Sequence, residues 1–269
     1  MEAKKQNKIR LCDREDLLVD IDSNTGEILF LKDRQLNLTL IDQPPLWELQ
    51  VNRKPVKFSL FFHEDRRGIL QTIGRLTHYA AYSQGWGLQL ARLAVPGRHS
   101  LHFQYRIKRV PMERCYPVPG PTSHDLEMPL WVETLGFLGW RFSLIAPGSM
   151  MRVCHLSGGG PVEHMSAEDG PMSEVVPKLW HWMRRVYPGV QSIPGVLFYR
   201  TRPASWLFIL ARRSRWSYLT DFNLQGVQFH VQYHRFMKPL DEFPVPEISL
   251  FWGRDLKEME KVWAGQFDQ

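Results

Sequence analysis

The stretch that decides the fold is DIDSNTGEILFLKDR, residues Asp20 to Arg34, in which two short runs of alternating apolar residues flank the segment Asn24–Gly26. Alternation with a period of two predicts strands that are half buried in a sheet. The side chains of Asp22 and Asn24 can hydrogen-bond to nearby backbone, and Gly26 can adopt the positive φ of a short hairpin loop. The stretch therefore predicts a β-hairpin.

Similar segments follow along almost the whole chain, divided by turn signals such as Pro44-Pro45 and Pro96-Gly97. The predicted strands cover residues 9–12, 17–22, 27–32, 46–51, 56–63, 69–79, 85–93, 99–109, 130–134, 139–145, 149–155, 196–201, 205–212, 215–220, 226–235 and 246–252. Residues 101–108 and 227–234 alternate most clearly and have one apolar and one polar face. This pattern predicts an all-β fold, a large sandwich of two antiparallel sheets with few short helices.

Two long stretches interrupt the strands. Residues 111–129 contain five prolines and are predicted to be a loop. Residues 157–195 are also predicted to be a long loop, and they carry the densest group of polar and aromatic side chains in the chain. Binding groups on a rigid sandwich usually lie on such loops, so we expect a binding site near residues 157–195.

Charge and composition are those of an ordinary globular protein. The chain has 269 residues, 43% apolar and 23% charged, with a formal net charge of +6 at pH 7. Because lysines and arginines are scattered through the chain, the charge indicates surface potential rather than a nucleic-acid interface. We therefore expect no nucleic-acid partner.

The cysteines, Cys12, Cys115 and Cys154, are far apart and have no C-x-x-C spacing, which indicates neither a disulfide framework nor a zinc site. No cofactor is expected. The N-terminal segment MEAKKQNKIR is polar, and the apolar run from Ala204 to Ala211 is too short to span a membrane. We therefore expect a soluble, cytoplasmic protein with no membrane partner.

The end of the chain predicts a helix over residues 255–264. Asp255 is a candidate N-cap with Glu258 three residues on, and Leu256, Met259 and Trp263 fall on one helical face. Two interpretations are open. The helix docks back on the sandwich, or residues 255–269 begin a linker to a further domain, in which case part of the apolar face is exposed.

Several segments resemble the large β-supersandwich domains of galactose-mutarotase type. The resemblance lies in the hairpin SNTGEILFLKDR (residues 23–34) and in PPLWELQV (44–51). It continues with Tyr187-Pro188-Gly189, with WSYLTD (216–221) before Gly226, and with the final strand-glycine-helix junction. It implies an all-β supersandwich over residues 1–254, of the kind that precedes the catalytic barrel in glycoside-hydrolase-like multidomain proteins.

The resemblance implies a carbohydrate-associated domain, either accessory to a downstream catalytic domain or binding carbohydrate alone. Two alternatives remain, an active sugar epimerase or other carbohydrate enzyme on the same fold, and a non-catalytic structural or interaction domain. Catalytic mutarotase-type sandwiches use a histidine to protonate the ring oxygen and a glutamate to take the anomeric proton. The asparagine-histidine segment typical of that chemistry is not found in this sequence, so the enzymatic alternative lacks a complete motif.

The residues themselves give little independent support for catalysis. Pro147-Gly148-Ser149-Met150 lacks the second glycine of a nucleophile elbow, and Ser157–Pro161 lacks the Lys-Ser/Thr of a phosphate loop. His230 and His234 are expected on one face of a strand about 13 Å apart, too far for one metal ion. No metal site is predicted.

Aromatic and basic residues together give the best signal for a site. Sugars present flat C–H faces and a rim of hydroxyls, which fit an aromatic platform beside polar groups. Trp180, Met183 and Tyr187 also have the spacing of an amphipathic turn that packs on the sheet, so a structural role is the alternative. The predicted carbohydrate-binding residues are Trp180, Trp182, Arg184, Arg185, Tyr187, His230 and His234.

Overall fold

The computed structural model describes residues 8–64, 69–76, 86–110, 130–146, 148–157, 164–176, 195–211, 218–223, 226–238, 241–244 and 247–265. Its strands are antiparallel and form three hydrogen-bonded sheets, so the predicted all-β fold is confirmed. The first sheet has four strands in chain order: β1 (Lys8–Asp13), β2 (Leu17–Asp22), β3 (Ile28–Asp33) and β4 (Leu38–Ile41).

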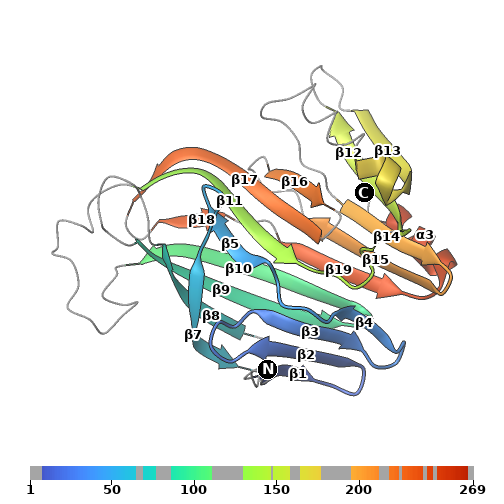
Figure 1. Ribbon diagram of the computed structural model, residues 1–269, viewed down its shortest axis with the longest axis horizontal. Helices are drawn as coiled ribbons and strands as arrows, with labels where there is room; N and C mark the ends of the chain where they lie inside the picture. The colour runs from blue at the N-terminus through green and yellow to red at the C-terminus, as the bar shows by residue number, and fades with distance from the viewer. Residues whose placement is uncertain are drawn as a thin grey trace, which may run out of the picture.

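The second sheet has ten strands and extends from β7 at the lower left of Figure 1 to β13 at the upper right. Its order is β13 (His164–Pro171), β12 (Met150–Ser157), β14 (Gly195–Thr201), β15 (Ala204–Ala211), β19 (Ile248–Gly253), β10 (Ser100–Val110), β9 (Trp86–Gly97), β8 (Ile69–Leu76) and β7 (Lys57–Glu64), with β18 (Glu242–Pro244) beside β10. The third sheet has five strands. Its order is β16 (Tyr218–Asn223), β17 (Gly226–Met237), β11 (Leu130–Trp140), β5 (Trp47–Val51) and β6 (Lys54–Pro55).

The opening hairpin forms as predicted between β2 and β3. The side chain of Asp22 accepts hydrogen bonds from the backbone N–H groups of Asn24 (2.7 Å) and Thr25 (3.0 Å). Gly26 has a φ of +74°, which a residue without Cβ adopts without strain. The turn therefore depends on the two residue types that the sequence pattern singled out.

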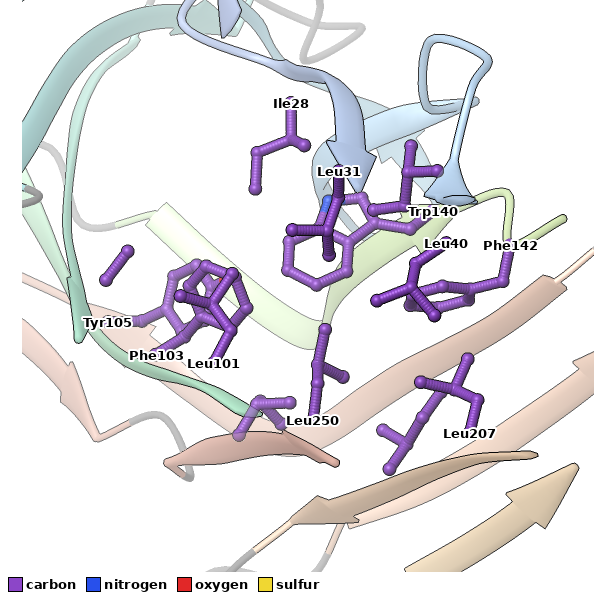
Figure 2. Packing of buried hydrophobic residues seen from close by; sticks show 14 of the residues in the cluster. Ile28, Leu31, Leu40, Leu101, Phe103, Tyr105, Trp140, Phe142, Leu207 and Leu250 are labelled. Atoms are coloured by element: carbon purple, nitrogen blue, oxygen red, sulfur yellow. The ribbon is translucent and has the colours of Figure 1, made fainter. Parts of the chain in front are cut away.

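The core lies between the sheets and takes side chains from all three. Trp140 of β11 packs edge-to-face on Phe103 of β10, with ring centroids 4.8 Å apart. Figure 2 shows Leu31 and Leu40 of the first sheet lying beside Trp140. Each of these four residues is at most 1% exposed, so the three sheets share one apolar core.

Three predictions about elements were wrong. Residues 164–176 are not loop, because they form β13 and a helical segment over 172–176. Strand β13 lies at the edge of its sheet, and its sequence HMSAEDGP is polar and lacks the apolar–polar alternation by which strands were predicted. Residues 130–140 form a single strand, in place of the two strands predicted over 130–134 and 139–145. Strand β4 was not predicted, and residues 111–129 lie outside the described residues.

The terminal helix is confirmed as α3 (Leu256–Ala264), with Asp255 as N-cap, whose side chain accepts from Lys257 N at 2.8 Å. Met259 is 3% exposed and joins a second apolar cluster with Trp206 and Phe208. Leu256 and Trp263 are partly buried against that cluster. The helix therefore docks on the ten-stranded sheet by one face.

An ion pair and a cation–π contact from Arg152 also hold the same helix. The guanidinium of Arg152 on β12 binds Glu260 of α3 at 2.7 Å and Asp169 of β13 at 2.8 Å. Its Cζ also lies 5.6 Å from the ring centroid of Trp263. The Tyr199 hydroxyl donates to Asp169 at 2.8 Å. Burial, followed by the bond to Asp169, raises the pKa of Tyr199 to about 12.

Candidate functional site

Five of the seven predicted site residues lie outside the described residues, namely Trp180, Trp182, Arg184, Arg185 and Tyr187. His230 and His234 belong to β17, and the backbone of His230 pairs with Gly136 of β11 and Leu219 of β16. The predicted binding set therefore remains a prediction, and the site described below is built from other residues.

An exposed aromatic pair lies where β11 and β17 run side by side (Figure 1). Trp131 of β11 is 38% exposed, and its register partner Phe236 of β17 is 56% exposed. The two rings meet edge-to-face with centroids 5.0 Å apart. Large aromatic side chains are usually buried, so two in contact on the surface indicate a binding surface.

Strand alternation explains why the pair faces outward. Val132 follows Trp131 and is fully buried, and Met237 follows Phe236 and is 1% exposed. Successive side chains of a strand point to opposite faces, so the inward positions take core residues and the outward ones carry the aromatic rings. The aromatic pair therefore rests on a packed core.

The turn between β5 and β6 holds the Trp131 segment in place. Asn52 and Arg53 have φ values of +49° and +64°, the left-handed pair required by a two-residue hairpin turn. The Asn52 amide donates to the carbonyl of Trp131 at 3.0 Å, and its Oδ1 accepts from the N–H groups of Glu133 (2.8 Å) and Thr134 (3.2 Å). The aromatic pair is thus built on three neighbouring strands.

Charged side chains lie next to the aromatic pair along the chain. Glu133 is exposed two residues after Trp131, and Lys238 is exposed two residues after Phe236. Arg53 and Lys54 are exposed on the turn that Asn52 anchors. Together these four residues supply hydrogen-bond donors and one acceptor. We call this set, Trp131 and Phe236 with Arg53, Lys54, Glu133 and Lys238, the aromatic platform.

The sequence contained a signal for the aromatic platform that was not used. In the predicted strand 130–134, alternation places Trp131 on the same face as Glu133 and opposite Val132. A tryptophan on the polar face of a half-buried strand is unusual, because that face normally carries solvated side chains. The pairing of Trp131 with Phe236 could not be seen, because the two residues are distant in sequence.

A polar cluster around Arg92 and Glu48 lies in the core and is not a candidate site. Arg92 binds Glu48 at 2.6 Å, and both side chains are at most 4% exposed. Trp140 donates to the other oxygen of Glu48 at 3.3 Å. Burial raises the pKa of the neighbouring Tyr105 hydroxyl well above its ordinary value of 10. These groups bind one another and are closed to solvent, so they stabilise the core.

A second buried carboxylate, Asp33, also has a structural environment. Its Oδ2 binds His99 at 2.6 Å and accepts from the Trp252 indole at 2.8 Å, while its Oδ1 accepts from Leu36 N at 2.7 Å. These bonds connect β3 to the turn between β9 and β10 and to β19. The carboxylate is saturated by donors from the protein itself.

The described residues contain no group of three or more His, Cys, Asp or Glu side chains suited to a metal ion. Within the same residues, no helix has both the length and the apolar character needed to cross a membrane.

Comparison with known proteins gives matches in structure only. No family model and no curated protein matches the chain. A galactose mutarotase related enzyme from Lactobacillus acidophilus is similar over 91% of this chain and 97% of its own, with 9% identity and a TM-score of 0.47. A galactose mutarotase-like protein from Clostridium acetobutylicum is similar over 89% and 93%, with 9% identity and a TM-score of 0.48.

A multidomain enzyme is among the similar structures as well. The alpha-galactosidase from Lactobacillus brevis is similar over 94% of this chain and 40% of its own, with 9% identity and a TM-score of 0.43. The similar region is less than half of that enzyme and nearly all of the two mutarotase-like proteins. In the arrangement of its strands, the chain is similar to galactose mutarotase-like proteins, whose domains several of its segments resemble in sequence.

Proposed function

We propose that this domain binds carbohydrate and serves as a non-catalytic binding or accessory domain. The observation that carries the proposal is the contact of two exposed aromatic rings, Trp131 and Phe236, on the surface of the five-stranded sheet. A pyranose ring presents C–H groups that pack on such a surface, and its hydroxyls reach to polar side chains at the edge.

The residue types of the aromatic platform favour binding over catalysis. Glycoside hydrolysis requires two carboxyl groups about 5 to 10 Å apart on either side of the scissile bond. Of the residues that define the aromatic platform, one carries a carboxylate, Glu133, and the others are aromatic or basic. This set can hold a sugar but lacks a second acid for the reaction.

The test is a glycan array followed by calorimetric titration of the best glycan. Loss of one aromatic ring is expected to weaken binding by about 2- to 10-fold, since such contacts contribute about 0.5–1.5 kcal/mol beyond area burial. Trp131→Ala and Phe236→Ala are compared with Val95→Ala, which removes another exposed apolar side chain, 45% exposed, from a different sheet. Thermal melts check that each variant is folded.

The titration also separates the aromatic platform from the residues predicted from sequence. Weakened binding in Trp131→Ala and Phe236→Ala, with no change in Val95→Ala, supports the platform. Weakened binding only in Trp182→Ala or His230→Ala supports the sequence-predicted set instead. Absence of binding to any glycan contradicts the proposal and favours a structural or interaction domain.

A further inference from the structure

A pocket of about 510 Å³ lies at the end of β14, on the ten-stranded sheet. It is lined by Gly148, Met150, Tyr199, Arg200, Thr201 and Arg202. Small-molecule sites commonly have volumes of about 300–1,000 Å³, so the pocket has the size of a ligand site. It shares no residue with the aromatic platform, which lies on the five-stranded sheet.

Arg200 is held in this pocket by a buried hydroxyl. Its Nε donates to Oγ of Ser149 at 3.1 Å, and Ser149 is fully buried. The Ser149 hydroxyl in turn donates to the carbonyl of Leu144 at 2.7 Å. With Nε fixed in this way, the guanidinium is oriented and its terminal N–H groups make no hydrogen bond within the described part of the chain.

The positive charge of the pocket is not neutralised by its lining. Arg200 and Arg202 both line it, neither forms an ion pair with any described residue, and none of the lining residues is acidic. The carboxylate of Asp169 is bound by Arg152 at 2.8 Å and by the Tyr199 hydroxyl at 2.8 Å. Two arginines therefore line one pocket whose lining contains no acidic residue.

We infer that this pocket binds a small molecule that carries a phosphate or carboxylate group. The fork of N–H donors on a guanidinium matches the oxygens of either anion, and such charge-assisted hydrogen bonds are the strong ones. The lining also includes the apolar residue Met150 and the exposed Thr201, which carries a hydroxyl. The inference does not depend on glycan binding at the aromatic platform.

The test is calorimetric titration with three probes, inorganic phosphate, glucuronate and glucose, at about physiological ionic strength. Arg200→Gln and Arg202→Gln remove one charge each, and Arg200→Lys keeps the charge but loses the fork. Arg98→Gln is the matched control, because Arg98 is exposed on the turn between β9 and β10 and does not line the pocket. Thermal melts confirm that the variants are folded.

The expected result is saturable binding of phosphate or glucuronate and none of glucose. Arg200→Gln and Arg202→Gln should each weaken anion binding by roughly 5- to 10-fold, and Arg98→Gln should leave it unchanged. Binding of only one anion identifies which group the pocket prefers. Equal binding of glucose, equal loss in Arg98→Gln, or no anion binding at all overturns the inference. Loss of glycan binding in Trp131→Ala alone has no bearing on it.

Discussion

Arg92 Nη1 lies 2.6 Å from Glu48 Oε1, and this buried ion pair joins the ten-stranded sheet to the five-stranded sheet. The second terminal nitrogen of Arg92 donates to the carbonyl of Gly26 at 2.8 Å, in the hairpin of the first sheet. One guanidinium therefore connects all three sheets at the turn between β2 and β3.

Removing this guanidinium should destabilise the protein strongly. Arg92→Ala leaves Glu48 buried without its partner, and we expect the free energy of unfolding to fall by about 3–5 kcal/mol. Urea denaturation measures the change, with Arg106→Ala, an exposed arginine on β10, as control. The double variant Arg92→Met, Glu48→Leu should lose less than Arg92→Ala, because it removes both charges. If Arg92→Ala lowered the free energy of unfolding by less than about 1 kcal/mol, the ion pair would not be important for stability.

The elements of the fold could be predicted from sequence because period-two alternation is a local signal. The same pattern also places Arg92 on the face of β9 that carries Leu88, Leu90 and Ala94, all buried. A charged residue on an apolar face indicates a buried partner, but its identity depends on a residue 44 positions away. Sequence alternation therefore identifies Arg92 as a charged residue at a buried position, but it does not identify Glu48 as its partner.

The candidate site was less predictable for a related reason. The sequence singled out a segment in which aromatic and basic residues are neighbours along the chain. The aromatic platform instead joins residues from the β5–β6 hairpin, β11 and the end of β17, which meet only through strand pairing. The sheet order that brings them together is not encoded in any one segment.

A pH dependence is expected from Asp33. Burial acts to raise its pKa, but hydrogen bonds from Leu36 N, Trp252 and His99 outweigh burial and hold the pKa below its ordinary value of 3.8. A carboxyl with a lowered folded-state pKa stabilises the fold above its unfolded-state pKa, and that stability is lost as the pH falls through the folded-state pKa.

The free energy of unfolding should therefore fall below about pH 4, and Asp33→Asn should flatten that part of the profile while lowering stability at neutral pH. Urea denaturation at a series of pH values measures both effects. Asp42→Asn, a change at an exposed carboxylate, serves as control. Equal slopes in the wild type and in Asp33→Asn would contradict the prediction.

The strand-glycine-helix junction requires Gly253 for a steric reason. A Cβ at this position would lie 2.7 Å from atoms of the Trp206 indole, which is buried and donates to the carbonyl of Asp255 at 3.0 Å. We expect Gly253→Ala to lower the free energy of unfolding by about 1–3 kcal/mol through overpacking. Gly265→Ala is the matched control, because Gly265 has a φ of −63°, which alanine adopts freely. Equal effects of the two changes on thermal stability would exclude the steric explanation.

Asn52 should control the aromatic platform without touching a ligand, because its side chain fixes the backbone of Trp131, Glu133 and Thr134. Asn52→Gly keeps the positive φ and removes all three side-chain hydrogen bonds, whereas Asn52→Asp keeps Oδ1 as acceptor and loses the bond to the Trp131 carbonyl. We expect Asn52→Gly to lower the free energy of unfolding by about 1–2 kcal/mol and Asn52→Asp to lower it less. Glycan affinity should follow the same order, and amide hydrogen exchange at Glu133 and Thr134 should accelerate in Asn52→Gly only. If both variants bind glycan as the wild type does while these amides exchange faster, the turn supports the sheet but does not position the rings.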